Sequence, residues 1–226
     1  SSDLFGNKVL HEASRGFSVE VVKLLLKHER DINELSEHGS TPLHMAAFWG
    51  REDTVRLLLT KGADPKRVNN YGAAALHDAA CRGQVEVLKL LLEYGEDVNQ
   101  ESENGRTPLH FVAKFNSAEA ARLLLDLGAD IKRVSNDGNT ALHDVAYWGA
   151  AEVAKLLLTH EADVDHKNKD GDTALHVAAY FGREEVAKAL LEGGADAELF
   201  NKNGNKVLHE AACGGSMEVV KLLLKY

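Results

Sequence analysis

The chain has 226 residues, of which 44% are hydrophobic and 27% are charged, a balance that predicts a folded protein and excludes a disordered one. Its formal net charge of -9 would repel a nucleic-acid backbone, so we expect no nucleic-acid partner. No run approaches the roughly 18 apolar residues of a membrane helix, no signal-peptide pattern is present and there are only two cysteines, so we expect a cytoplasmic or nuclear protein without direct membrane insertion.

A repeat of 33 residues organises the chain. Each copy begins near a glycine, and a Leu-His pair follows with its histidine five residues after that glycine. Seven copies in register cannot arise by chance, and no linker separates them, so we predict one domain over residues 1–226 with a truncated last copy. The repeat glycines are Gly6, Gly39, Gly72, Gly105, Gly138, Gly171 and Gly204.

Each copy predicts two short helices. The first begins at pairs such as Thr41-Pro42, because threonine can cap a helix and proline suits its first position. The second runs through stretches such as Glu86 to Glu93, with its leucines on the buried side, and an extended hairpin leads to the next copy. Neither helix is long enough to be stable alone, so stacking on neighbouring copies must supply the burial. Glycines predicted at positive φ between the two helices are Gly50, Gly83, Gly149 and Gly182.

Thr41-Pro42-Leu43-His44-Met45-Ala46-Ala47, Thr107-Pro108-Leu109-His110 and Gly62-Ala63-Asp64 resemble the signature of the ankyrin repeat family, and the resemblance covers residues 6 to 226. It implies an all-α, ankyrin-repeat solenoid of stacked helix-turn-helix units with hairpin loops. It also implies a non-catalytic scaffold that binds a protein or peptide on its concave groove and hairpin tips.

Four turn positions depart from the family pattern. Phe17 and Asn116 replace the glycine between the helices, and Glu29 and Glu161 replace the glycine after the second helix. Asparagine tolerates the left-handed conformation, whereas phenylalanine and glutamate tolerate it poorly. We therefore expect the turns at Phe17, Glu29 and Glu161 to be locally reshaped.

The eleven histidines raise the question of a metal or catalytic site. Seven of them are the repeat histidine, and neighbouring copies lie about 10 Å apart, too far for two of these rings to bind one zinc ion. We interpret them as bridges to loop backbone that tie the copies together. The acidic stretch from Asp163 to Asp172 lacks the spacing of a calcium loop. No nucleophile elbow or phosphate-binding fingerprint is present, so we predict no catalytic residue, no metal and no cofactor.

Aromatic residues gather nine and ten residues after the repeat glycine, at the end of the first helix. In ankyrin proteins these positions line the groove that contacts partners. Packing between first helices as ordinary core is the alternative, but leucines, alanines and valines already supply a core in every copy. We therefore favour an interface, in which the Arg82 side chain could stack on Trp49 or Phe115. The predicted partner-binding residues are Phe48, Trp49, Arg82, Phe111, Lys114, Phe115, Tyr147, Trp148, Tyr180 and Phe181.

The hairpin tips alternate in charge. Basic tips contain Lys66, Arg67, Lys132 and Arg133, whereas the tips of copies one and three are acidic. Two interpretations stay open: weak mutual neutralisation between neighbouring hairpins, or an electrostatic guide that orients a partner.

The first and last copies are nearly the same sequence. Residues 6–27 and 204–225 are identical at 18 of 22 positions, and the last copy keeps its apolar residues, whereas an independent array normally ends in a polar face. We expect a segment of a longer array or an engineered chain, with sticky ends and possible end-to-end self-association. The alternative function is therefore that of a structural spacer within a larger adaptor, channel or toxin. An enzyme is the least favoured function, because no titratable groups converge.

Overall fold

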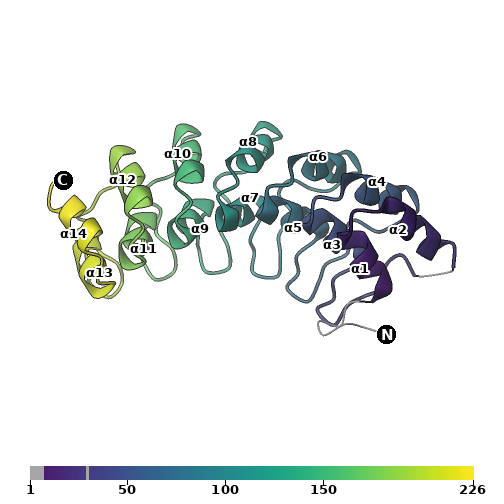
Figure 1. Ribbon diagram of the computed structural model, residues 1–226. Helices are drawn as coiled ribbons and strands as arrows, with labels where there is room; N and C mark the ends of the chain where they lie inside the picture. Colours follow the sequence, from purple (N-terminus) through teal and green to yellow (C-terminus); the bar gives the residue numbers. More distant parts are fainter. Residues whose placement is uncertain (1–7, 29–30) are drawn as a thin grey trace. The chain divides into compact units, whose positions relative to one another are not determined.

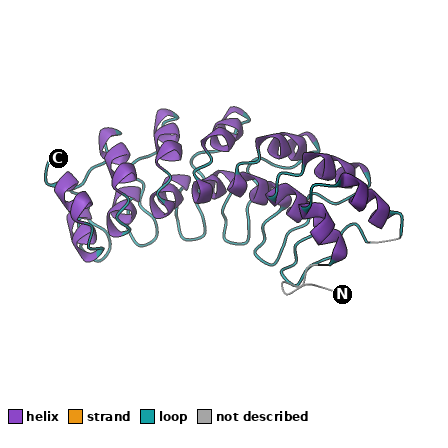
Figure 2. Ribbon diagram, in the orientation of Figure 1, coloured by secondary structure: helices purple, strands orange, loops and turns teal. Residues whose placement is uncertain are grey.

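The computed structural model describes residues 8–28 and 31–226 (Figure 1), so Gly6 and Glu29 lie outside the described residues. The chain divides into two compact units, residues 1–108 and 109–226. Within the described ranges, fourteen α-helices and one 3-10 helix are joined by loops, and no β-strand forms (Figure 2). The all-α prediction is therefore confirmed.

Helices come in pairs, one pair to each 33-residue copy (Figure 1). The first unit contains α1 (Val9–Arg15), α2 (Val19–Leu26), α3 (Pro42–Phe48), α4 (Glu52–Thr60), α5 (Ala75–Arg82) and α6 (Val85–Glu93). Helix α7 (Pro108–Phe111) begins at the last residue of that unit. The second unit continues with the 3-10 helix (Val112–Phe115), α8 (Ala118–Asp126), α9 (Ala141–Trp148), α10 (Ala151–Thr159), α11 (Ala174–Tyr180), α12 (Glu184–Glu192), α13 (Val207–Cys213) and α14 (Met217–Leu223).

Stacking of successive pairs builds the core of each unit. In the first unit, α3 packs between α1 and α5, and in the second unit α11 packs between α9 and α13. The second helices stack in the same way, with α12 between α10 and α14. Leucines of both helices are fully buried in these contacts, which fits short amphipathic helices that are stable only through tertiary packing.

The turns follow the sequence prediction with one informative exception. Gly50, Gly83, Gly149 and Gly182 all have positive φ, between 64° and 82°, and Asn116 takes the same conformation at φ 53°. The turn at Phe17 is reshaped as expected: Phe17 is not at positive φ, and the preceding Gly16 is extended. The expectation of a reshaped turn at Glu161 was wrong, because this residue keeps the left-handed conformation at φ 60°.

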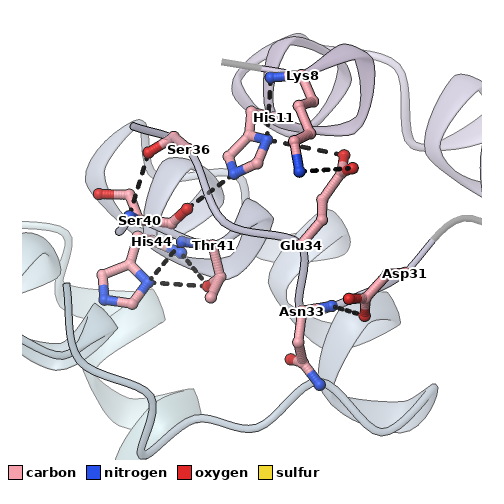
Figure 3. A network of polar contacts seen from close by, with 9 residues as sticks. All are labelled: Lys8, His11, Asp31, Asn33, Glu34, Ser36, Ser40, Thr41 and His44. Carbon is pink, nitrogen blue, oxygen red and sulfur yellow. Dashed lines mark hydrogen bonds and ion pairs between the residues drawn. The ribbon is translucent and has the colours of Figure 1, made fainter. Parts of the chain in front are cut away.

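The repeat histidines connect successive copies, as predicted. In Figure 3, the His11 ring reaches the next copy, where Nε2 lies 2.8 Å from the carbonyl oxygen of Ser40. Nδ1 of His44 accepts a hydrogen bond from the backbone N–H of Thr41, 3.2 Å away, and its Nε2 lies 3.0 Å from the carbonyl oxygen of Ala73. Because Nδ1 accepts from an N–H, the proton must sit on Nε2, which donates to the carbonyl.

The same bond recurs at His110, His143 and His176 in the second unit, at 3.0 to 3.2 Å. At His77, Nε2 lies 3.0 Å from the carbonyl oxygen of Gln100, earlier in the following loop, and the backbone of Arg106, at the recurring position, also hydrogen-bonds this ring. Burial lowers the pKa of His44, His77 and His143 to about 4. These rings are therefore neutral at pH 7, which suits one donor and one acceptor nitrogen.

The hairpins are less regular than predicted. The expected extended segments are turns, and the β-bridges in the described residues are three isolated ones, Val68 with Ala74, Val134 with Thr140 and Phe200 with Lys206. Adjacent hairpins nevertheless bond to each other: the backbone N–H of Asp64 donates to the Asn33 side chain over 3.0 Å. The backbone N–H of Asn70 also donates to the carbonyl oxygen of His38 over 2.9 Å, so side-chain and backbone bonds hold the loops without a continuous sheet.

Candidate functional site

Two arginines and two rings meet at the ends of the first helices in the first unit. The rings of Phe48 and Trp49, at the end of α3, are in edge contact with centroids 5.5 Å apart. The guanidinium carbon of Arg82 lies 4.9 Å from the Phe48 centroid and 5.5 Å from that of Trp49. The guanidinium of Arg15 lies 5.6 Å from the same Trp49 ring. We call Arg15, Phe48, Trp49 and Arg82 the first-unit ring surface.

The corresponding positions of the second unit carry mostly rings. Tyr147 contacts Trp148 at 5.1 Å between centroids and Phe181 at 4.7 Å, and Phe181 contacts Tyr180 at 5.1 Å. Each of these contacts is an edge arrangement, the geometry that aromatic pairs prefer. The ammonium of Lys114 lies 5.8 Å from the Phe115 ring and 5.6 Å from that of Trp148. Lys114, Phe115, Tyr147, Trp148, Tyr180 and Phe181 form the second-unit ring surface.

The rings at these positions differ in exposure. Phe115, Tyr147, Trp148, Tyr180 and Phe181 are each 41 to 47% exposed. Trp49 is 36% exposed, and Phe48 and Phe111 are half-buried. Beneath them, leucines and alanines such as Leu142 and Ala146 are almost completely buried. The core of each unit is therefore closed without the exposed rings.

Side chains that sequence reasoning missed hold the ends of the first helices in place. The Gln84 amide donates to the carbonyl of Phe48 over 3.4 Å, and Nε of Arg183 donates to that of Tyr147 over 3.1 Å. Nε of Arg51 donates in the same way to Arg15, over 2.8 Å. All three donors directly follow the inter-helix turn position. That recurrence in the sequence was the signal that could have found them.

Gly214, at the end of α13, occupies a ring position of the last copy. A Cβ added there would lie 2.0 Å from the carbonyl oxygen of Tyr180, far inside any real contact. The backbone of the last copy thus approaches the end of α11 so closely that only glycine fits. The second-unit ring surface therefore ends at Tyr180 and Phe181.

All four basic residues of the hairpin tips are exposed. Nε of Arg67 lies 3.9 Å from Asp64, and Nε of Arg133 lies 3.7 Å from Asp130. Both pairs join residues of the same hairpin three positions apart. These contacts leave the tip cations at the surface, where a partner can reach them, and such exposed pairs contribute only about 0 to 1 kcal/mol.

The titratable groups with shifted pKa serve the repeat framework, apart from Glu96. Burial raises the pKa of Glu96 to about 8, and the nearby Lys66 opposes this effect. Both of its carboxylate oxygens are buried without a hydrogen-bond partner. Among the residues that the structure places, no three His, Cys, Asp or Glu side chains are grouped to hold a metal ion. In the same residues, no helix has both the length and the apolar character needed to cross a membrane.

Three segments of the chain, residues 1–69, 76–168 and 155–226, match a family model described as ankyrin repeats in three copies. The human ASB11 ankyrin repeat domain, a solved structure, is 28% identical with a TM-score of 0.82, over 97% of this chain and 98% of that chain. The ankyrin repeat domain of Bcl-3, described as a unique member of the IkappaB protein family, is 29% identical with a TM-score of 0.72, over 97% and 99%. No curated protein matches the chain.

Proposed function

The chain belongs to the ankyrin repeat family, and from that premise we propose that it is a non-catalytic scaffold that holds a protein or peptide partner on its two ring surfaces. Ankyrin repeat domains generally bind other proteins and typically carry no catalytic activity. The ring surfaces occupy the positions that line the concave groove in this family. The hairpin tips with Lys66, Arg67, Lys132 and Arg133 are the second part of the proposed contact area.

The observation that carries the proposal is the exposed aromatic cluster of the second unit. Five rings that contact one another or share a lysine are each more than two-fifths exposed. Clustered exposed apolar groups on a folded protein mark interaction sites, and tryptophan, tyrosine and arginine are the residues that most often dominate binding energy. The closed core beneath them gives these rings no structural task that requires their size.

The surface is also held in place before any partner arrives. Edge contacts fix the rings of Tyr147, Phe181 and Tyr180 against each other. The hydrogen bond from Arg183 fixes the backbone at Tyr147. Rings that are already ordered lose little conformational entropy on binding, so more of the contact energy contributes to affinity.

Affinity capture with the wild-type chain, followed by a binding titration with the purified captured protein, tests the proposal. Trp148→Ala combined with Phe181→Ala should weaken that partner at least tenfold, a loss of about 1.4 kcal/mol or more. Trp49→Ala combined with Trp148→Ala tests both units together. Tyr94→Ala is the matched control, because Tyr94 is 42% exposed at the end of a second helix.

Urea unfolding of the same variants separates binding from folding. The ring variants should lose about 1 kcal/mol or less of unfolding free energy, as surface substitutions do. Unchanged partner affinity in both double variants would sink the proposal. A loss of several kcal/mol in stability would show instead that the rings belong to the core.

The tip cations are proposed to guide the partner. Charges at the rim of an interface act mainly on the association rate. Lys132→Gln with Arg133→Gln should therefore slow association at low salt and leave dissociation nearly unchanged in stopped-flow measurements. An unchanged association rate would favour the other interpretation, local neutralisation of the hairpins.

A further inference from the structure

A cavity of about 460 Å³ lies in the second unit beside the pair of α9 and α10. Lys132 lines it from the hairpin before α9, and Glu161 lines it from the turn after α10. Its floor is apolar, since Ala141, Leu142 and Leu157 also line it and are almost completely buried. Small-molecule sites have volumes of about 300 to 1,000 Å³ and combine apolar walls with a few polar groups, so the cavity has the size and composition of such a site.

Two opposite charges line this cavity without neutralising each other. Lys132 and Glu161 are both exposed, yet no ion pair joins them, and neither forms one with any residue that the structure describes. Asp163, a second carboxylate of the lining, is engaged on its own hairpin, where it accepts from the Asp165 N–H over 3.3 Å and lies 3.9 Å from Nδ1 of His166. The cavity therefore offers one unpaired ammonium and one unpaired carboxylate on separate hairpins.

The turn does not itself require the Glu161 side chain. In other copies this position carries glycine at positive φ, whereas Glu161 takes the same conformation at φ 60°. A side chain strains the backbone there, and glycine would relieve that strain. Residues held in strained conformations gather at ligand-binding sites, which agrees with a task for this carboxylate at the cavity.

The first unit fills the equivalent place differently. Ala162, which lines the cavity, corresponds to Glu96 two copies earlier. Glu96 is only 6% exposed, and neither of its carboxylate oxygens has a hydrogen-bond partner, so its side chain occupies interior space. The short Ala162 side chain leaves room in the second unit, where the carboxylate stands one residue earlier and is exposed, at Glu161.

We propose that this cavity binds a small zwitterion, a free dipeptide with apolar side chains. The ammonium of the ligand pairs with Glu161, its carboxylate pairs with Lys132, and its side chains contact the apolar floor. A single amino acid carries both charges on one carbon, whereas a dipeptide separates them by a peptide unit and suits groups on two hairpins. The site takes a free molecule and is tested without a protein partner, so the proposal does not depend on the proposed function.

Isothermal titration calorimetry of the 226-residue chain with the dipeptides Leu-Leu, Phe-Leu and Leu-Phe gives the first test. At least one of them should bind saturably, with one molecule per chain. Gly-Gly carries the same charges without apolar side chains and should bind at least about tenfold more weakly. Absence of saturable binding by all three apolar dipeptides would overturn the proposal, as would equal affinity for Gly-Gly.

Glu161→Gly and Lys132→Gln test the two charged walls. Each should weaken the best-bound dipeptide about tenfold, and urea unfolding should show Glu161→Gly to be at least as stable as the wild type, so unfolding cannot explain its loss of binding. Lys66→Gln, at the equivalent position of the first unit, is the matched control and should bind like the wild type. Unchanged affinity in either cavity variant would overturn the assignment of a zwitterion.

Capped ligands assign each end of the dipeptide to its wall. The N-acetylated form lacks the ammonium and should bind Glu161→Gly and the wild type equally weakly. The C-terminal amide lacks the carboxylate and should fail in the same way to distinguish Lys132→Gln from the wild type. Ala162→Leu fills the cavity and should abolish binding, with circular dichroism to confirm its fold. Full affinity in that variant would place the ligand elsewhere and overturn the proposal.

Discussion

The two units present different chemistry at equivalent positions. In the first unit, two guanidinium groups reach the single indole of Trp49. In the second unit, Tyr147 and Phe181 contact each other directly, and one lysine, Lys114, lies near the rings of Trp148 and Phe115. Both surfaces stand at the ends of the first helices of their copies.

This difference separates the framework residues, which recur in every copy, from the positions at which the residue type varies. Buried leucines and bridging histidines recur in both units, whereas the positions nine and ten residues after the repeat glycine carry arginine, lysine, glycine, cysteine, phenylalanine, tyrosine or tryptophan. Framework substitutions should therefore act alike in the two units. Substitutions at the variable positions, or at residues present in one unit only, should act differently.

The largest expected effect comes from the shared core. Leu76 in the first unit and Leu175 in the second are both completely buried. Leu76→Ala and Leu175→Ala should each lower the free energy of unfolding by about 2 to 5 kcal/mol, and by similar amounts, because the same cavity forms in the same framework. Urea unfolding followed by circular dichroism measures both. A loss below about 1 kcal/mol in only one unit would break the equivalence of the two cores.

Glu96 is a difference between the two units, because only the first unit has a carboxylate at this position. Four described copies have alanine there, namely Ala63, Ala129, Ala162 and Ala195. Burial raises the pKa of Glu96 to about 8 from its usual 4.5, so the folded state holds its proton more tightly than the unfolded state. Proton binding at Glu96 therefore contributes fully to the free energy of unfolding below pH 4.5. This contribution is lost as the pH rises to about 8.

Glu96→Ala should therefore stabilise the chain by about 2 to 4 kcal/mol at pH 8. At this pH the wild-type protein must either bury an ionised carboxylate or bind a proton that the unfolded chain has released. The gain should shrink as the pH falls towards 5. Unfolding free energies of both proteins over this range provide the measurement. An equal gain at pH 5 and pH 8 would contradict the assignment of the effect to ionisation.

Acid should destabilise both units through the histidines. The pKa of His44, His77 and His143 is lowered by burial to about 4, whereas the unfolded chain binds these protons near pH 6.5. The neutral rings contribute fully to the free energy of unfolding above pH 6.5. This contribution, about 3 kcal/mol for each ring, is lost as the pH falls to about 4. His143→Gln should flatten the slope of stability against pH in this window. A slope that the variant leaves unchanged would count against a neutral buried ring.

Much of the fold could be predicted from the sequence, because the seven copies can be aligned with one another and show which positions recur. Positive φ at Gly83 and the bridge from His143 to the next loop both depend on residues within one or two copies. Burial of Glu96 did not follow, because it depends on how the hairpin containing Lys66 lies against it. The mixed α and 3-10 character of residues 108–115 was not predicted either. Exposure of Trp148 was expected, but the contacts that order it required the positions of its neighbours.

A smaller difference concerns backbone strain. After the second helix, Gly62 and Gly95 of the first unit and Gly128 and Gly194 of the second have positive φ, and in the second unit Glu161 takes this conformation with a side chain, at φ 60°. A left-handed conformation strains a residue with a side chain by about 1 to 2 kcal/mol, and glycine loses part of that gain through its greater freedom when unfolded. Glu161→Gly should stabilise the chain by about 1 kcal/mol, measured by urea unfolding. Gly128→Ala, in open space at φ 88°, is the reciprocal control and should destabilise by a similar amount.

The smallest expected effect distinguishes the two ring surfaces most directly. Double-mutant cycles that pair Arg82→Gln with Trp49→Leu, and Lys114→Gln with Trp148→Leu, isolate the cation–π energy in each unit. Exposed contacts of this kind contribute about 0.5 to 1 kcal/mol, and arginine should exceed lysine because its planar group stacks and is less strongly hydrated. The absence of coupling would show that the cations merely lie near the rings, and equal couplings would contradict the expected difference between arginine and lysine. A larger coupling at Trp49 would mean that a partner must displace an arginine from the first-unit ring surface or bind over it, whereas in the second unit the rings of Tyr180 and Phe181 are open to contact.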